Sequence, residues 1–121
     1  MTLTNALLVA LGAAVGAPLR YLVNHGIRIR FGGTPVAGTL VVNVVGSFVL
    51  GVVVGAGLGT APLSLVGIGF CGAFTTFSTL ALEIWDAMDD DRYPHAVANV
   101  ALSLTLGLGA AWLGWVLAGG G

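Results

Sequence analysis

Charged residues are scarce in this sequence. Only 7% of the 121 residues are charged and lysine is absent, whereas soluble domains carry roughly a quarter charged residues. Four arginines and five acidic residues give a formal net charge of -1, so no basic patch is present to bind nucleic acid or an acidic polymer. The composition therefore excludes an ordinary soluble domain and a nucleic-acid-binding protein.

Groups that commonly carry catalysis are also few. The single cysteine, Cys71, cannot form an intrachain disulfide or a thiolate metal site. The two histidines, His25 and His95, fall at the edges of apolar segments, where interfacial side chains are common. No phosphate-binding loop or nucleophile motif is present, and no acidic residue precedes Glu83. The sequence therefore does not predict an enzyme.

Apolar residues, in contrast, are abundant. They make up 57% of the chain, 20 further residues are glycine, and the mean hydropathy is +1.02. A bilayer-spanning helix needs about 20 mostly apolar residues. We therefore predict a single-domain, all-α, multi-pass membrane protein surrounded by lipid, with spans over residues 3–22, 36–58, 62–88 and 94–118. Thr34, Thr60 and Asp91, each followed by a proline within three residues, are the predicted helix-start signals.

Small and polar residues recur every four positions along the predicted spans, which places them on one face of each helix. Glycines on such a stripe, such as Gly12 and Gly16, are typical of close helix packing in lipid. Asn43 is different, because its amide donors are costly to leave unpaired in a membrane. We interpret Asn43 as a ligand-binding or pathway residue.

The third span contains the run GIGFCGAFTTFSTLALE, residues 67–83. Its glycines lower helix propensity by about 1 kcal/mol each relative to alanine, and four hydroxyl side chains follow within five positions. Non-helical backbone is tolerated at membrane depth only inside protein or beside a wet cavity. We therefore predict a break between Gly72 and Thr75. The alternative is a kinked packing helix whose hydroxyls bond their own helix.

Three motifs resemble the Fluc/CrcB family of fluoride channels: GAPLRY in the first span, GTLVVNVVGSFVLG in the second, and GFCGAFTTFST followed by Glu83 in the third. The resemblance implies an antiparallel, dual-topology dimer in the plasma membrane of a prokaryote. Two pores would export cytoplasmic fluoride passively and confer fluoride resistance. The third helices, broken near the middle, would cross at the centre and hold one structural sodium ion.

The resemblance also implies roles for individual residues. The carbonyls of Gly72 and Thr75 would bind sodium, Asn43 would be the pore amide, and Phe77 would offer its ring edge to the anion. Arg20 and Glu83 would belong to the vestibule and helix-end structure. The implied anion pathway also includes a track of hydroxyl side chains: Thr39, Ser78, Thr79 and Ser103.

Two positions depart from the family pattern. Leu80 replaces a second phenylalanine that usually follows Phe77 by three residues, and Asn99 stands where the family often has tyrosine. All four arginines belong to one side of the predicted topology or to the span ends that face it, and the positive-inside rule makes this side cytoplasmic, with both termini outside. Either a homodimer or a heterodimer with an oppositely oriented homologous subunit is compatible with these features.

Two other functions fit a small four-span protein. A small multidrug exporter of this size couples transport to protons through a carboxylate in its first span, and this chain has no acidic residue before Glu83. A non-transporting scaffold subunit would need the small-residue stripes but not the hydroxyl run. Fluoride, being small and strongly hydrated, must exchange its water for short hydrogen bonds, which amide and hydroxyl donors can supply. The fluoride channel therefore explains the most residues.

Overall fold

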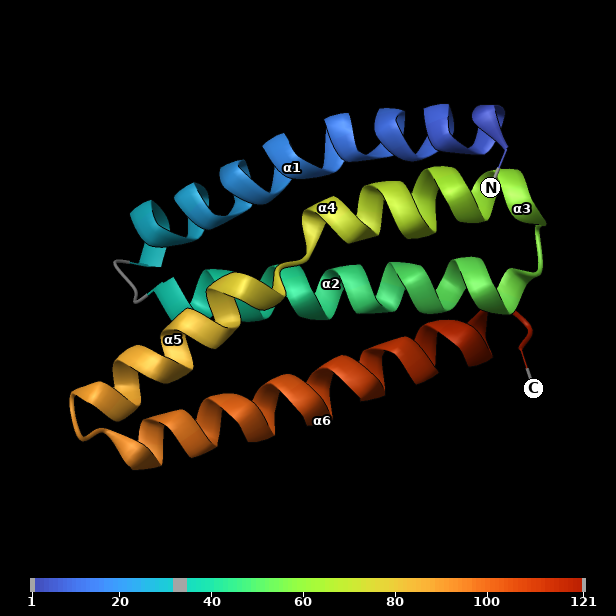
Figure 1. The fold of residues 1–121 in the computed structure, drawn as a ribbon. Helices are drawn as coiled ribbons and strands as arrows, with labels where there is room; N and C mark the ends of the chain where they lie inside the picture. Colours follow the sequence, from blue (N-terminus) through green and yellow to red (C-terminus); the bar gives the residue numbers. More distant parts are fainter. Residues whose placement is uncertain (1, 32–34, 121) are drawn as a thin grey trace.

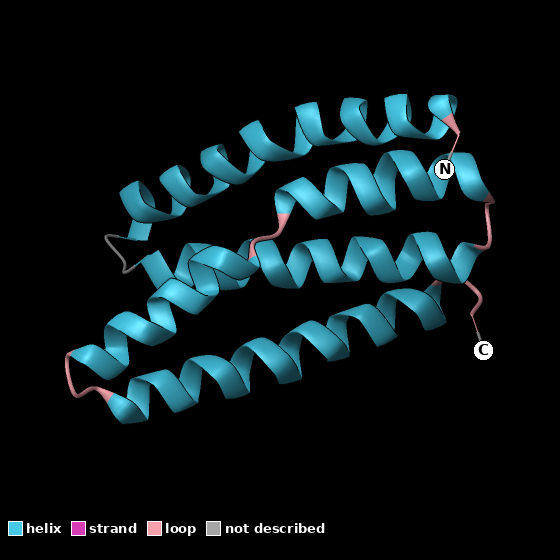
Figure 2. Cartoon of the chain, in the orientation of Figure 1, coloured by secondary structure: helices cyan, strands magenta, loops and turns pink. Residues whose placement is uncertain are grey.

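The computed structural model describes residues 2–31 and 35–120, and every regular element in these ranges is helical (Figures 1 and 2). Four helical stretches are long and apolar enough to cross a membrane. This confirms the predicted all-α class with four candidate spans. The first, second and fourth stretches are α1 (Leu3–Phe31), α2 (Pro35–Ala56) and α6 (Tyr93–Leu117). The third stretch consists of α3 (Thr60–Pro62), η1 (Leu63–Cys71), α4 (Gly72–Phe74) and α5 (Phe77–Asp89).

The four stretches lie side by side in an elongated bundle (Figure 1). α1 packs along η1 and α4, and α2 packs along α6. α5 leaves the direction of α4, crosses α2 and reaches α6. Both chain ends lie at one end of the bundle, and the turn from α5 into α6 lies at the other (Figure 1). The third stretch therefore begins against α1 and finishes against α6.

Several predicted helix boundaries differ from those in the structure. α1 continues to Phe31 instead of ending near Leu22, so most of the predicted first connection is helical. The predicted start signals at Thr60 and Asp91 are wrong, because Gly59 and Arg92 are the N-cap residues and neither makes a side-chain capping bond. A residue with positive φ stands at each of these two helix starts: Gly59 is the N-cap of α3, and Asp91 directly precedes Arg92, the N-cap of α6. The signal at Thr34 lies outside the described residues.

Close contact between α1 and the third stretch depends on glycine. A β-carbon on Gly12 would overlap the carbonyl of Leu65, and one on Gly16 would overlap the carbonyl of Phe70. On the facing side, Gly69 leaves no room for a side chain against Val9. Small residues on both helices thus let the two backbones approach directly, as expected for packing without a hydrophobic driving force.

The contact between α2 and α6 is built in the same way. A β-carbon on Gly51 would overlap the carbonyl of Ala111, and one on Gly114 would overlap the carbonyl of Phe48. Val42 and Thr39 on α2 are fully buried among the helices. The bundle is therefore two glycine-mediated pairs, and α5 bridges between them.

Two extended residues separate α4 from α5. Thr75 has φ/ψ of -84°/164° and Thr76 has -148°/120°, while Phe74 ends α4 and Phe77 begins α5. Immediately before α4, η1 is a nine-residue π-helix with i to i+5 bonding. Departures from α-helical bonding are thus concentrated in the glycine-rich half of the third stretch.

Candidate functional site

The side chain of Asn43 on α2 pairs with the peptide groups of Thr76. The Thr76 N–H donates to Asn43 Oδ1 at 2.8 Å, and Asn43 Nδ2 donates to the Thr76 carbonyl at 3.1 Å. The carboxamide therefore makes the same pair of bonds that a neighbouring backbone would make. An extended residue within an apolar bundle has both of its polar backbone groups satisfied by one side chain.

The hydroxyl of Thr76 caps the start of α5. Its Oγ1 accepts from the Thr79 N–H at 3.2 Å and donates to Thr79 Oγ1 at 3.1 Å, and it lies 3.3 Å from Ser78 Oγ. Thr75 Oγ1 donates to the Cys71 carbonyl, one turn earlier, at 2.9 Å. The hydroxyl run is thus bonded locally on both sides of the interruption, Thr75 back to η1 and Thr76 forward to α5.

Arg20 reaches the same segment from α1. The Nη1 atom of its guanidinium donates a hydrogen bond to the Thr75 carbonyl at 3.3 Å. The contact is partly buried and joins positions 55 residues apart. A cation at the end of α4 is favourable because it lies at the negative end of that helix. Arg20 on α1 and Asn43 on α2 therefore bond the carbonyl and the N–H of the same peptide unit, the one that joins Thr75 to Thr76.

The interruption releases backbone carbonyls from helical bonding, among them those of Gly72 and Thr75. In an α-helix the Gly72 carbonyl would accept from the Thr76 N–H, but this donor bonds Asn43. The Thr75 carbonyl would accept from the Thr79 N–H, but that donor bonds Thr76 Oγ1. A β-carbon on Gly72 would meet nothing within 4 Å, so this position faces open space.

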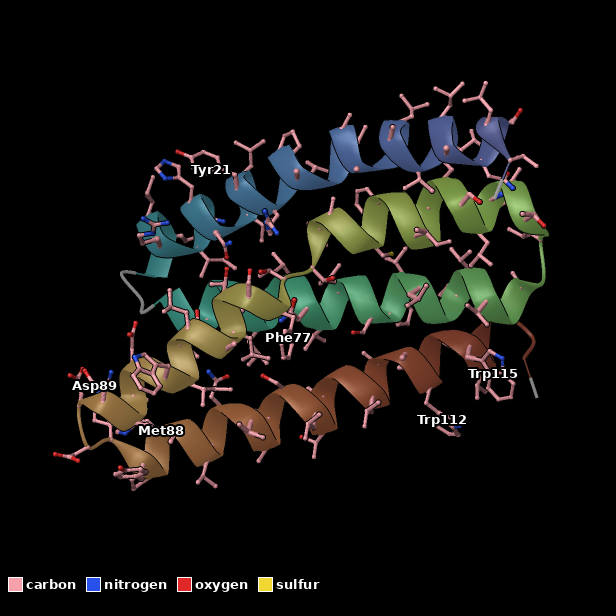
Figure 3. All side chains as sticks on the ribbon, viewed as in Figure 1. Tyr21, Phe77, Met88, Asp89, Trp112 and Trp115 are labelled. Atoms are coloured by element: carbon pink, nitrogen blue, oxygen red, sulfur yellow. The ribbon has the colours of Figure 1, made fainter. Side chains whose placement is uncertain are left out.

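A surface cavity of about 550 Å³ adjoins these groups. Asn43, Gly72, Thr75, Phe77 and Leu80 are among its lining residues. Phe77 is 81% exposed and lies at the point where α5 begins (Figure 3). The cavity therefore gathers an amide, released carbonyls and an aromatic ring on one open face of the subunit.

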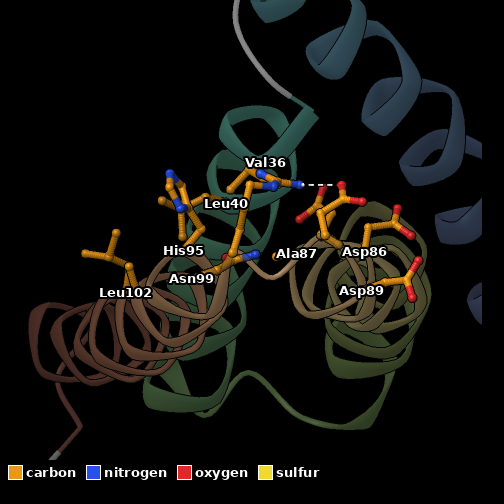
Figure 4. Close-up of a pocket in the computed structure, with 12 residues that line it drawn as sticks. Val36, Leu40, Asp86, Ala87, Asp89, His95, Asn99 and Leu102 are labelled. Atoms are coloured by element: carbon orange, nitrogen blue, oxygen red, sulfur yellow. Dashed lines mark hydrogen bonds and ion pairs between the residues drawn. The ribbon is translucent and has the colours of Figure 1, made fainter.

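A second cluster of polar side chains comes from α2, α5 and α6. Thr39 Oγ1 donates to Glu83 Oε2 at 2.7 Å, while Glu83 Oε1 is buried and has no partner among the described residues. On α6, Ser103 Oγ donates to Asn99 Oδ1 at 3.2 Å. Glu83 and Asn99 both line a cavity of about 520 Å³ (Figure 4). Its rim also carries Asp86, Asp89, Asp90, Arg92 and His95.

The structure thus places most of the predicted site residues in two groups. Asn43, Gly72, Thr75 and Phe77 line one cavity. Thr39 and Glu83 bond each other, and Ser103 bonds Asn99, on the side of the second cavity. Ser78 and Thr79 belong to the Thr76 capping network between the two groups.

The sequence prediction missed two contributions to this site. Thr76 was counted only as one of several hydroxyls, although a threonine before a helical run is a common N-cap and could have been identified. The bond from Arg20 to Thr75 has no local sequence signal, because the two residues are 55 positions apart.

Comparison with known proteins identifies the family. The model of the family described as CrcB-like protein, Camphor Resistance (CrcB), matches residues 7–115. A protein of Frankia casuarinae named fluoride-specific ion channel FluC 1 is 45% identical over 123 aligned positions, covering 94% of this chain and 95% of the relative. A FluC 1 of Geobacillus kaustophilus is 44% identical, covering 90% and 93%.

A further relative from Nocardia farcinica, also named fluoride-specific ion channel FluC 1, is 43% identical over 89% of this chain and 76% of the relative. These matches extend across all four candidate spans and include the interrupted segment. They confirm the family resemblance drawn from the sequence motifs. The chain therefore belongs to the CrcB family of membrane proteins, together with relatives that are named fluoride-specific ion channels.

Proposed function

We propose that this protein is a fluoride-selective ion channel that exports cytoplasmic fluoride passively across a prokaryotic plasma membrane. The observation that carries the proposal is the 45% identity to a relative named fluoride-specific ion channel over 94% of the chain. The cavity beside Asn43 supports it, because it combines amide and aromatic groups without an acidic side chain in its lining.

The proposed anion contacts use donors that carry no formal charge. One N–H of the Asn43 amide bonds Thr76, and the other N–H is available to an anion in the cavity that Asn43 lines. The exposed ring of Phe77 can turn its positive edge toward the same anion. The proposed track then continues over hydroxyl side chains, Ser78 and Thr79 on α5, Thr39 on α2 and Ser103 on α6.

The pore requires a partner subunit. The cavity beside Asn43 opens on the surface of the subunit, and Phe77 is exposed there. An anion stripped of water needs donors on all sides, since unpaired polar groups are costly in lipid. We therefore propose an antiparallel dimer with two pores, in which the partner is either a second copy or a homologous subunit of opposite orientation.

The released carbonyls fit the proposed structural sodium ion. Hard cations prefer oxygen ligands, and unwound carbonyls at half-helix ends bind sodium in other membrane proteins. The Gly72 carbonyl has lost its helical donor, and the Thr75 carbonyl keeps a second lone pair beyond its bond to Arg20. Bound at the dimer centre, the cation would supply fixed positive potential for an anion.

The proposal is tested by fluoride and chloride efflux from liposomes that contain the purified protein. We expect rapid fluoride efflux and negligible chloride efflux, from this chain alone or together with an oppositely oriented homologue. Equal rates for the two halides would contradict selectivity. Absence of fluoride flux under both conditions would instead support a scaffold subunit.

A further inference from the structure

We infer that Asn43 is a positioning residue that holds the third stretch in its interrupted form within a single subunit. This role is distinct from the contact with the anion assigned to Asn43 above, although its importance for conduction rests on the proposed function. The inference comes from the paired bonds between the Asn43 carboxamide and the Thr76 peptide groups, at 2.8 and 3.1 Å.

The energetic reason lies in the burial of Thr76. Thr76 is 7% exposed, so water has little access to its N–H and carbonyl groups. Its extended backbone removes the N–H from the α-helical pattern, and a peptide group left unpaired in lipid is strongly unfavourable. Asn43 supplies an acceptor and a donor together, which an aliphatic side chain at this position cannot do.

The clamp fixes more than one residue. Because the Thr76 N–H is held by Asn43, the Gly72 carbonyl is released. Because Thr76 is held in place, its hydroxyl can cap α5 through the Thr79 N–H and so fix where that helix begins. Phe77 is the first residue of α5, so its position depends on the same clamp. One side chain on α2 thereby couples the carbonyls, the start of α5 and the aromatic ring.

The control is Asn99, a buried asparagine in the spanning helix α6. It is 8% exposed, and its hydrogen bond is to Ser103 on its own helix. Asn99→Leu and Asn43→Leu therefore make the same chemical change, at a buried position in α6 and at a partly buried position in α2. Asn43→Leu removes a carboxamide that bonds α2 to the interrupted segment, whereas Asn99→Leu removes one that bonds within α6.

The experiment measures the distance between spin labels on either side of the interruption. Labels are placed at Ile68 and Leu82, which are both exposed, in a Cys71→Ala background. Labelled subunits are diluted with unlabelled ones so that only distances within a subunit contribute. A continuous α-helix would separate these Cα atoms by about 21 Å.

We expect a single narrow distance distribution in the otherwise unchanged protein and in Asn99→Leu. In Asn43→Leu we expect loss of this peak, either by broadening or by a shift toward the continuous-helix distance. Asn43→Asp keeps the acceptor for the Thr76 N–H and should show an intermediate distribution. An unchanged narrow peak in Asn43→Leu would overturn the inference.

A second measurement covers the case in which Asn43→Leu does not fold. Amide hydrogen exchange of the native protein should show Thr76 protected, because its N–H is bonded to Asn43. Rapid exchange at Thr76 would overturn the clamp without any variant. If the clamp is confirmed but the native protein conducts no fluoride, the proposed function fails and the structural role of Asn43 stands.

Discussion

At the scale of single residues, Thr76 has the most local hydrogen-bond partners in the interrupted segment. Its hydroxyl accepts from the Thr79 N–H and bonds the Thr79 hydroxyl, while its peptide groups bond Asn43. The hydroxyl run therefore has a structural explanation that its residue types alone did not reveal. Any role of these hydroxyls toward an anion must be compatible with this network.

Thr76→Val tests the capping bond. The valine keeps the shape of threonine but cannot accept from the Thr79 N–H. We expect the free energy of unfolding to fall by about 1 kcal/mol, the usual cost of losing an N-cap. Reversible unfolding in mixed micelles measures the change. Thr105→Val is the control, since the Thr105 hydroxyl is exposed and bonds a carbonyl of its own helix, and an equal loss there would contradict the capping role.

The bond between Thr39 and Glu83 is the second test at this scale. The Thr39 hydroxyl donates to Glu83 Oε2 at 2.7 Å and joins α2 to α5. In a double-mutant cycle with Thr39→Val and Glu83→Leu, each of which removes the bond, we expect a coupling free energy of about 1 kcal/mol in unfolding measurements. Strictly additive losses would show that the two side chains do not stabilise each other.

At the scale of the elements, the packing of α1 against η1 and α4 depends on glycines that admit a facing backbone. Gly16 and Gly26 lie on the same helix, but only Gly16 has a neighbouring carbonyl where a β-carbon would stand. A β-carbon on Gly26 would meet nothing within 4 Å. The two positions therefore separate intrinsic helix propensity from packing.

We expect Gly16→Ala to destabilise the protein by about 1–3 kcal/mol, because the overlap forces the helices apart. Gly26→Ala should be neutral or stabilising by up to about 1 kcal/mol, since alanine is the better helix former. The midpoint of thermal unfolding in detergent compares the two variants. A stabilising Gly16→Ala would show that the tight contact between α1 and η1 is wrong.

At the scale of the whole molecule, three of the four arginines define one end. Arg28 and Arg30 lie in the last turn of α1, and Arg92 lies in the turn between α5 and α6, at the end of the bundle away from both termini (Figure 1). Asp89 ends α5, and Asp90 and Asp91 share that turn, but acidic residues contribute little to membrane orientation. The distribution therefore favours insertion with this end in the cytoplasm.

We expect a reporter fused after Gly121 to be detected only outside the cytoplasm. A homodimer of antiparallel copies would need both orientations, so a single orientation predicts that full fluoride flux requires an oppositely inserted homologous subunit. Detection of the reporter in both compartments would exclude this arrangement and support the homodimer. Alkaline phosphatase and green fluorescent protein fusions distinguish the two results.

The sequence by itself determined the fold class and the family. Four apolar stretches, each of about the 20 residues that a spanning helix needs, indicate membrane helices, in which every backbone group can be bonded within its own stretch. The motifs around Asn43 and Phe77 determined the family because their order and spacing are specific. Glycine spacing also indicated close packing, since a repeat of four places residues on one helix face.

Tertiary structure alone decided which partners the polar residues have. Asn43 and Thr76 are 33 positions apart, Thr39 and Glu83 are 44 apart, and Arg20 and Thr75 are 55 apart. A helical pattern describes only neighbours within about one turn, so it cannot specify contacts between helices. The direction in which α5 leaves α4 depends on these long-range bonds, and for this reason the site's geometry became visible only in the folded chain.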